Sequence, residues 1–229
     1  MPIKENLLQI KSQLPDNVTL VAVSKTKPVE DLMEAYHAGQ RIFGENKIQE
    51  MTEKWQQMPK DIEWHMIGHV QSNKVKYMVP YVKLIHGVDS LKLLKEINRQ
   101  AVRWRKNVDC LLQIHIAEEE TKFGLDENEL EELLNSEEFK KMTNINVIGL
   151  MGMATFTDNQ EQIKREFDYL KSLFNKYKSL KTDTSDSELA KQNCQLNTLS
   201  MGMSGDYQLA IDCGSTMVRI GSSIFGGRK

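Results

Sequence analysis

Short apolar runs alternate with amphipathic segments along the whole chain. The first run, residues 18–24, is continuous and rich in β-branched side chains, which is typical of a strand buried on both faces. Pro28 then stands at a favoured position for the first turn of a helix, acidic residues follow it, and Gly39 is placed to end the helix. The same unit recurs to the C-terminus, so the pattern predicts an α/β protein.

The pattern predicts eight strands, each followed by a helical segment. The strands are expected at residues 18–24, 41–46, 62–67, 82–86, 108–116, 145–151, 196–201 and 216–220. Helices are expected at residues 1–14, from Pro28 to Gly39, after Asn46 through Trp55, and at residues 72–78, 90–104, 126–134, 159–180, 204–213 and 222–225. Strict alternation favours a closed (β/α)8 TIM barrel over a doubly wound open sheet.

No interdomain linker is recognisable, so we expect a single TIM-barrel domain over residues 1–229, with residues 1–14 as an extra helix packed on the outside. The one polar stretch of low hydrophobicity, residues 181–193, is interpreted as a surface loop.

Composition excludes several classes of function. The chain has 229 residues, with 30 Lys and Arg against 32 Asp and Glu, so it offers no general electrostatic case for binding nucleic acid or an anionic membrane. No apolar run is long enough for a membrane span, and the N-terminus lacks a signal-peptide core. The three cysteines lie far apart in sequence, which argues against a disulfide framework and suits a protein of the reducing cytoplasm. The histidines are scattered, so no metal site is predicted.

Candidate chemistry lies where the strands end, because the active face of such a barrel is formed there. The loops after the seventh and eighth strands are short, contain Gly and Ser, and both lead into a helix. Small residues and free N–H groups at such positions suit a phosphate. The structural alternative is that Ser204 only caps a helix and Gly221 only turns the chain.

Lys25 follows the first strand at the mouth of the barrel. An amine rooted in an apolar wall becomes a neutral nucleophile that can form a Schiff base with an aldehyde. Taken alone, however, this position favours a lysine that extends into water. Together with a phosphate site, it fits a phosphorylated aldehyde, of which pyridoxal 5′-phosphate (PLP) is the obvious example. Arg219, directly before the second loop, could face the ring nitrogen.

At these positions the sequence resembles the pyridoxal phosphate homeostasis proteins, which are similar to the N-terminal barrel of alanine racemase. The resemblance covers nearly the whole chain in order. Its motifs are VAVSKTKP at 21–28, FGEN at 43–46, WHMIGHVQSNK at 64–74, KFG at 122–124, GLM at 149–151, SMGMS at 200–204, VRIG at 218–221 and IFG at 224–226.

The resemblance implies that Lys25 carries PLP covalently as an internal aldimine and that Arg219 lies near the pyridine nitrogen. It implies four neighbours of the phosphate: Ser200, Ser204, Gly221 and Ser222. It also implies that Asn46 and Met151 line the cofactor pocket and that His65 sits close by. Members of the family are described as regulators of vitamin B6 and amino-acid balance without an established reaction. We therefore expect a monomeric, cytoplasmic protein that buffers PLP or delivers it to PLP-dependent apoenzymes.

Two enzymatic alternatives use the same residues. A Schiff-base aldolase acting on a sugar phosphate would bind no coloured cofactor. An amino-acid racemase needs a proton donor on each face of its substrate. Lys25 could serve one face, but the chain ends soon after the eighth strand, where the resembling racemase continues into the domain that supplies the second base. Tyr207 and His65 are weak candidates for that base, so no catalytic residue is expected.

Overall fold

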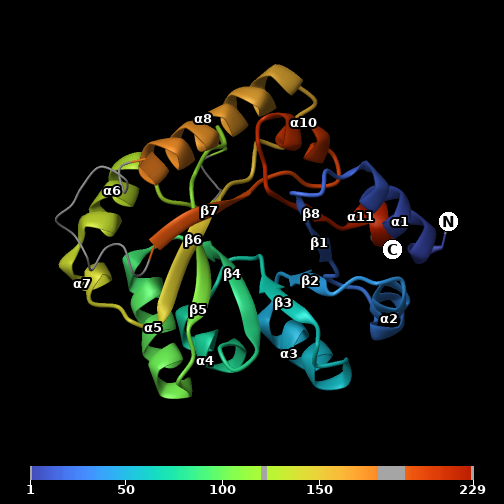
Figure 1. Ribbon diagram of the computed structural model, residues 1–229, viewed down its shortest axis with the longest axis horizontal. Helices are drawn as coiled ribbons and strands as arrows, with labels where there is room; N and C mark the ends of the chain where they lie inside the picture. The colour runs from blue at the N-terminus through green and yellow to red at the C-terminus, as the bar shows by residue number, and fades with distance from the viewer. Residues whose placement is uncertain (1, 120–122, 180–193, 228–229) are drawn as a thin grey trace.

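Eight parallel strands form a closed barrel in the computed structural model, which describes residues 2–119, 123–179 and 194–227 (Figure 1). The strands are β1 (Thr19–Val23), β2 (Ile42–Glu45), β3 (Glu63–Met66), β4 (Val82–Val88), β5 (Val108–Gln113), β6 (Ile145–Met151), β7 (Cys194–Ser200) and β8 (Met217–Ile220). Each strand pairs with the next along the chain, and β8 returns to pair with β1, in a register that sets Thr19 opposite Met217. The predicted barrel is confirmed, and the open sheet is excluded.

Helices surround the barrel in the predicted order. They are α1 (Ile3–Gln13), α2 (Val29–His37), α3 (Ile48–Gln57), the 3-10 turn η1 (Ser72–Lys74), α4 (Val75–Met78), α5 (Leu91–Trp104), α6 (Glu127–Asn135), α7 (Glu137–Lys140), α8 (Gln160–Ser179), α10 (Tyr207–Asp212) and α11 (Ser222–Phe225). The predicted extra N-terminal helix, α1, packs against α2 and α11, and Asn6 Nδ2 donates to the carbonyl of Ile224 at 3.0 Å.

Among the differences from the predicted elements, three have a clear local reason or position. Helix α7 was not expected; Ser136 begins it by accepting a hydrogen bond from the N–H of Phe139, whose side chain is buried. Strand β5 is shorter than predicted because Ile114 forms only an isolated bridge, to Leu125. The helix expected from Ser204 begins later, at Tyr207. The predicted surface loop 181–193 lies outside the described residues.

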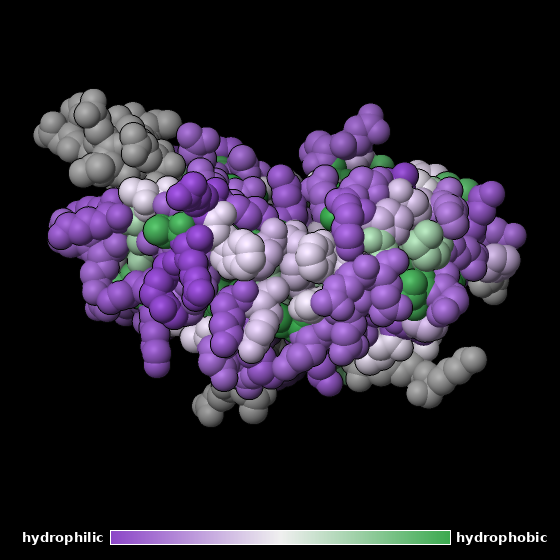
Figure 2. Space-filling view, turned by 90° about the horizontal axis from the view of Figure 1, so that it is seen from below, coloured by the Kyte–Doolittle hydropathy of each residue, from purple (hydrophilic) through white to green (hydrophobic). Residues whose placement is uncertain are grey.

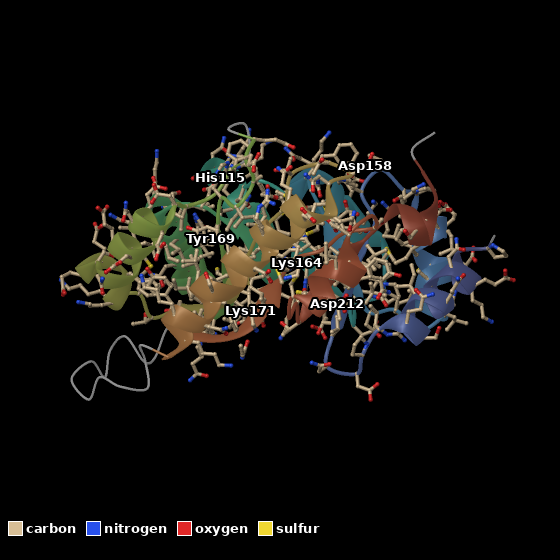
Figure 3. The ribbon with its side chains drawn as sticks, turned by 90° about the horizontal axis from the view of Figure 1, so that it is seen from above. His115, Asp158, Lys164, Tyr169, Lys171 and Asp212 are labelled. Carbon is tan, nitrogen blue, oxygen red and sulfur yellow. The ribbon has the colours of Figure 1, made fainter. Side chains whose placement is uncertain are left out.

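Apolar side chains are buried in two places. A small cluster inside the barrel contains Val21, Leu84, Leu111, Met151 and Met217, while the larger core lies between the strands and the helices. On one flank, α8 packs against β6, β7 and α10, and Figure 3 shows Lys164, Tyr169 and Lys171 along this helix with Asp212 on the neighbouring α10. This packing fixes the strand ends, and the loops after them, in space.

The outer surface in Figure 2 is mainly hydrophilic, and apolar side chains appear there only in small separate areas. Within the described ranges, no helix combines the length and the apolar character needed to cross a bilayer. The cysteines Cys110, Cys194 and Cys213 are buried, and no disulfide joins them.

Candidate functional site

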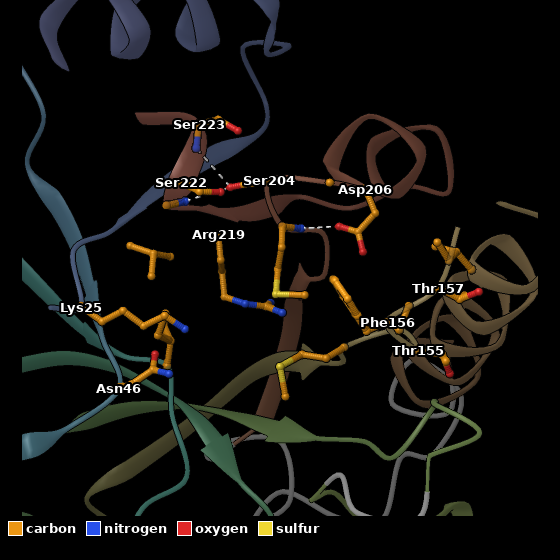
Figure 4. Close-up of a pocket in the computed structure, with 18 of the residues that line it drawn as sticks. Lys25, Asn46, Thr155, Phe156, Thr157, Ser204, Asp206, Arg219, Ser222 and Ser223 are labelled. Atoms are coloured by element: carbon orange, nitrogen blue, oxygen red, sulfur yellow. Dashed lines mark hydrogen bonds between the residues drawn. The ribbon is translucent and has the colours of Figure 1, made fainter. Parts of the chain in front are cut away.

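A cavity of about 750 Å³ opens at the C-terminal ends of the strands. Its walls come from the ends of β1, β2, β6, β7 and β8 and from the loops after them, so segments from both ends of the sequence meet there. Six of the nine expected site residues line it, namely Lys25, Asn46, Ser204, Arg219, Gly221 and Ser222 (Figure 4). Motifs that are far apart in sequence therefore meet in one cavity, because the strands that carry them all end at the same face of the barrel.

Lys25 and Asn46 form one side of this cavity. Lys25 follows β1 and Asn46 follows β2, and the two strands are paired neighbours. Figure 4 shows the Lys25 side chain reaching into the open space beside Asn46, on the side facing Arg219. An amine in this position can meet a ligand that is held from the opposite wall.

The loops after β7 and β8 form the opposite wall and are tied together by one hydroxyl. Ser204 Oγ accepts hydrogen bonds from the N–H of Gly221 at 3.2 Å and from the N–H of Ser223 at 3.5 Å. A Cβ on Gly221 would lie only 3.1 Å from the carbonyl oxygen of Val23, so glycine keeps this approach open. Backbone N–H groups and serine hydroxyls gathered in this way are suited to a phosphate.

Arg219 is a buried cation in the cavity wall, with only 4% of its surface exposed. Its Nη1 donates to Ser200 Oγ at 2.6 Å and its Nη2 to the carbonyl of Gly152 at 3.0 Å. Within the described residues, no carboxylate forms an ion pair with it. Burial lowers the pKa of Arg219 to about 10, so the group stays protonated at neutral pH. The charge of Asp206, which lines the same cavity, opposes this lowering only in part. A buried cation without a direct ion pair favours a ligand that is anionic or accepts hydrogen bonds.

The other three expected residues, His65, Met151 and Ser200, do not line the cavity but lie buried below it inside the barrel. Ser200 Oγ lies 3.2 Å from His86 Nδ1, and His86 Nε2 lies 3.1 Å from His65 Nδ1. Because Arg219 can only donate, Ser200 accepts from it and keeps its own proton available for His86. These three residues support the wall indirectly, and their contact with a cofactor stays a prediction.

Neither weak candidate for a second base is placed to act as one. The Tyr207 hydroxyl donates to Gln13 Oε1 at 2.7 Å, toward α1, and the residue does not line the cavity. Burial lowers the pKa of His65 to about 3, so its ring is neutral at physiological pH.

The two buried histidines predict a loss of stability in acid. Burial lowers the pKa of His65 from 6.5 to about 3 and that of His86 well below 6.5. The unfolded chain takes up protons at these rings near pH 6.5, while the folded chain does not. The contribution of the two neutral rings to the free energy of unfolding is therefore fully present above that pH. It falls as the pH drops below it, by up to about 1.4 kcal/mol per pH unit for each ring.

Urea unfolding between about pH 7 and pH 5 measures this slope. His65→Gln should make it shallower, whereas His37→Gln, at an exposed position on α2, should leave it in place. An unchanged slope in His65→Gln would contradict the conclusion that buried, neutral His65 causes part of the loss of stability in acid.

Several lining residues were not predicted. The loop after β6 contributes Thr155, Phe156, Thr157 and Asp158, and the loop after β7 contributes Asp206. Figure 3 also places Asp158 and His115 at the edge where the strands end. The rule that candidate residues lie where strands end could have found the loop after β6, because Met151 at the end of that strand is already a predicted site residue. His86 is one of the scattered histidines of the sequence, and no sequence spacing relates it to Ser200. The described residues contain no cluster of three or more His, Cys, Asp or Glu able to hold a metal.

Comparison with known proteins decides the family. The model of the alanine racemase N-terminal domain matches residues 2–229. A pyridoxal phosphate homeostasis protein from Pasteurella multocida (strain Pm70) is 38% identical over 241 residues, which cover 100% of this chain and 98% of that protein. The chain belongs to the pyridoxal phosphate homeostasis protein family. The member from Escherichia coli (strain K12) is 34% identical, over 99% of this chain and 97% of its own length.

Solved structures agree with this membership of the pyridoxal phosphate homeostasis protein family. PipY of Synechococcus elongatus PCC7942 is 33% identical, covers 98% of this chain and 100% of its own, and superposes with a TM-score of 0.88 without PLP and 0.81 with PLP bound. An alanine racemase from Clostridium difficile 630 is 17% identical with a TM-score of 0.73, and this chain covers 57% of it. That likeness concerns the fold alone.

Proposed function

We propose that this member of the pyridoxal phosphate homeostasis protein family binds PLP in the cavity at the strand ends and holds it for buffering or delivery, without turning over a substrate. The observation that carries the proposal is the meeting of the Lys25 amine and the Ser204–Gly221 loops in one cavity. The PLP-bound structure of the relative PipY supports the choice of ligand.

The residues of the cavity suit the parts of PLP. Ser204, Gly221 and Ser222 would hold the phosphate, and Arg219 would donate to the ring nitrogen. PLP, when bound, supplies an aldehyde and an aromatic ring that can withdraw electrons. The Lys25 amine would bond covalently to the aldehyde carbon with loss of water. Asn46 would line the pocket beside Lys25, while Ser200, Met151 and His65 would support the site from below.

Two features favour holding over catalysis. Arg219 is a permanent donor, so it would keep the ring nitrogen unprotonated and weaken the ring as an electron sink. Neither Tyr207 nor His65 is placed as an acid on the second face of a substrate. A racemase built on this site would therefore find its second proton donor in neither of the two residues expected to supply it. We therefore assign no catalytic residue.

A protein that buffers or delivers PLP needs a route by which the bound PLP can leave. The cavity opens outward at the strand ends, and loops supply most of its lining, with only the first turns of α8 and α11 beside them, which suits exchange of PLP with other proteins. We propose PLP-dependent apoenzymes as the recipients and a monomer as the working unit. A lasting complex of two copies in solution, found by light scattering, would overturn the second point.

Borohydride reduction followed by peptide mapping tests the site. The purified protein is incubated with PLP, reduced, digested and analysed by mass spectrometry. We expect a yellow protein before reduction and a pyridoxyl label on the peptide that contains Lys25. An uncoloured, unlabelled protein would overturn PLP binding through a lysine and would favour the sugar-phosphate aldolase. A label confined to another lysine would overturn the site.

A further inference from the structure

A buried network of charged side chains surrounds the backbone that carries Lys25. It consists of Glu45 at the end of β2 and of Glu50 and Lys54 on α3. The Lys54 ammonium donates to Glu45 Oε1 at 2.7 Å and to Glu50 Oε1 at 2.7 Å. Glu45 is fully buried and Lys54 is 5% exposed. None of the three side chains lines the cavity.

Three hydrogen bonds from this network end on the two neighbours of Lys25. Lys54 Nζ donates to the carbonyl oxygen of Ser24 at 2.8 Å, and Ser24 Oγ donates to Glu45 Oε1 at 2.7 Å. On the other side, the N–H of Thr26 donates to Glu50 Oε1 at 2.6 Å. The peptide segment on each side of Lys25 is therefore fixed by side chains that never reach the ligand space.

The backbone held in this way is strained. Thr26 has a φ of 63°, in the left-handed region that a β-branched residue rarely adopts and that is energetically unfavourable for it. The bond to Glu50 offsets part of that cost, because it satisfies the Thr26 N–H in this conformation. Without it, the segment is free to return to an ordinary φ, which would redirect the chain at Lys25.

Barrel stability alone does not account for such a network. Burying a lysine with carboxylates costs desolvation, and apolar replacements of similar volume are often as stable or more so. Glu45 Oε2 is also buried without a hydrogen-bond partner among the described residues. The hydrogen bonds of the network instead converge on Ser24 and Thr26, the two neighbours of Lys25. This convergence indicates that the network positions Lys25.

We propose that Glu50 and Lys54 are positioning residues that fix the backbone on both sides of Lys25, so that its amine enters the cavity at the angle needed to capture the aldehyde. This inference rests on the proposed function. It predicts that disturbing the network slows covalent capture of PLP and leaves noncovalent recognition of the rest of the ligand unchanged.

Glu50→Ala is the main test, because Glu50 is the partly exposed member of the network and its removal leaves Glu45 and Lys54 paired. It should slow capture by about tenfold, since small misplacement of a reacting group has large kinetic effects. Glu50→Gln keeps an oxygen that can accept from Thr26 and should stay within about twofold of the parent. Glu53→Ala, at an exposed position on the same helix, is the matched control and should not change capture.

Capture is measured as the fraction of Lys25 peptide labelled by borohydride at successive times after PLP is added. Pyridoxine 5′-phosphate, which has the phosphate and ring but no aldehyde, reports noncovalent affinity, and melting temperature reports folding. Slow capture in Glu50→Ala with unchanged analogue affinity supports the proposal, as does rescue by Glu50→Gln. Capture at the parental rate overturns it, and so does an equal loss of analogue affinity. Absence of a Lys25 label in the parent protein is the distinct failure of the proposed function.

Discussion

Lys25→Ala is expected to abolish borohydride-stable labelling by PLP. The variant keeps the serine loops and Arg219 but has no amine beside Asn46 to bond to the aldehyde. The yellow colour of the PLP-treated protein should disappear with the label. Affinity for pyridoxine 5′-phosphate should change little, because the phosphate and ring contacts come from the opposite wall. Absorbance, intact mass after reduction and equilibrium dialysis measure these three outcomes.

Two further variants make this result specific. Lys25→Arg keeps the positive charge, but a guanidinium stays protonated and does not attack an aldehyde, so the label should be lost there as well. Lys47→Ala removes an exposed lysine at the start of α3 and should be labelled like the parent. Full labelling of Lys25→Ala, on any other lysine, would contradict the role given to Lys25.

Gly149→Ala is expected to cause the largest loss of stability among single-methyl changes in the barrel. A Cβ at Gly149 in β6 would lie 1.7 Å from the carbonyl oxygen of Thr198 in β7. This contact involves backbone, so no side-chain rotation relieves it, and the two strands must separate. We expect a loss of about 3 kcal/mol or more in the free energy of unfolding. For a chain of this size, that lowers Tm by roughly 6–12 °C.

Gly205→Ala is the matched control, because a Cβ there meets nothing within 4 Å and its φ is not in the left-handed region. Its Tm should stay close to that of the parent. Thermal unfolding followed by circular dichroism compares the two variants. A Gly149→Ala protein that melts like Gly205→Ala would mean that the approach of β6 to β7 is looser than described.

The barrel could be predicted from sequence because its signals are local. Each buried strand is a short apolar run, such as residues 18–24, and residues such as Pro28 and Gly39 mark where helices begin and end. Once the strands are in order, the rule that strand ends share one face places Lys25 and Gly221 in the same region. Six residues of the cavity followed from that step together with the family resemblance.

The contacts beneath and behind the cavity could not be predicted in this way. His86 meets Ser200 across the barrel interior, and that meeting depends on the relative register of strands far apart in sequence. Lys54 reaches Ser24 only because α3 packs with one particular face against β2. From sequence alone, a lysine in a helix is expected to be exposed to solvent. Neither pairing leaves a spacing pattern that a single sequence could reveal.

The cavity joins the two ends of the polypeptide, since Lys25 belongs to the first strand unit while Ser204 and Arg219 belong to the last two. A ligand attached at both walls therefore acts as a cross-link across the place where the sheet closes on itself. Such a ligand binds the native chain and not the unfolded one, so mass action shifts the folding equilibrium toward the closed ring. Binding of PLP at this site, as proposed, would therefore also raise the resistance of the protein to denaturation.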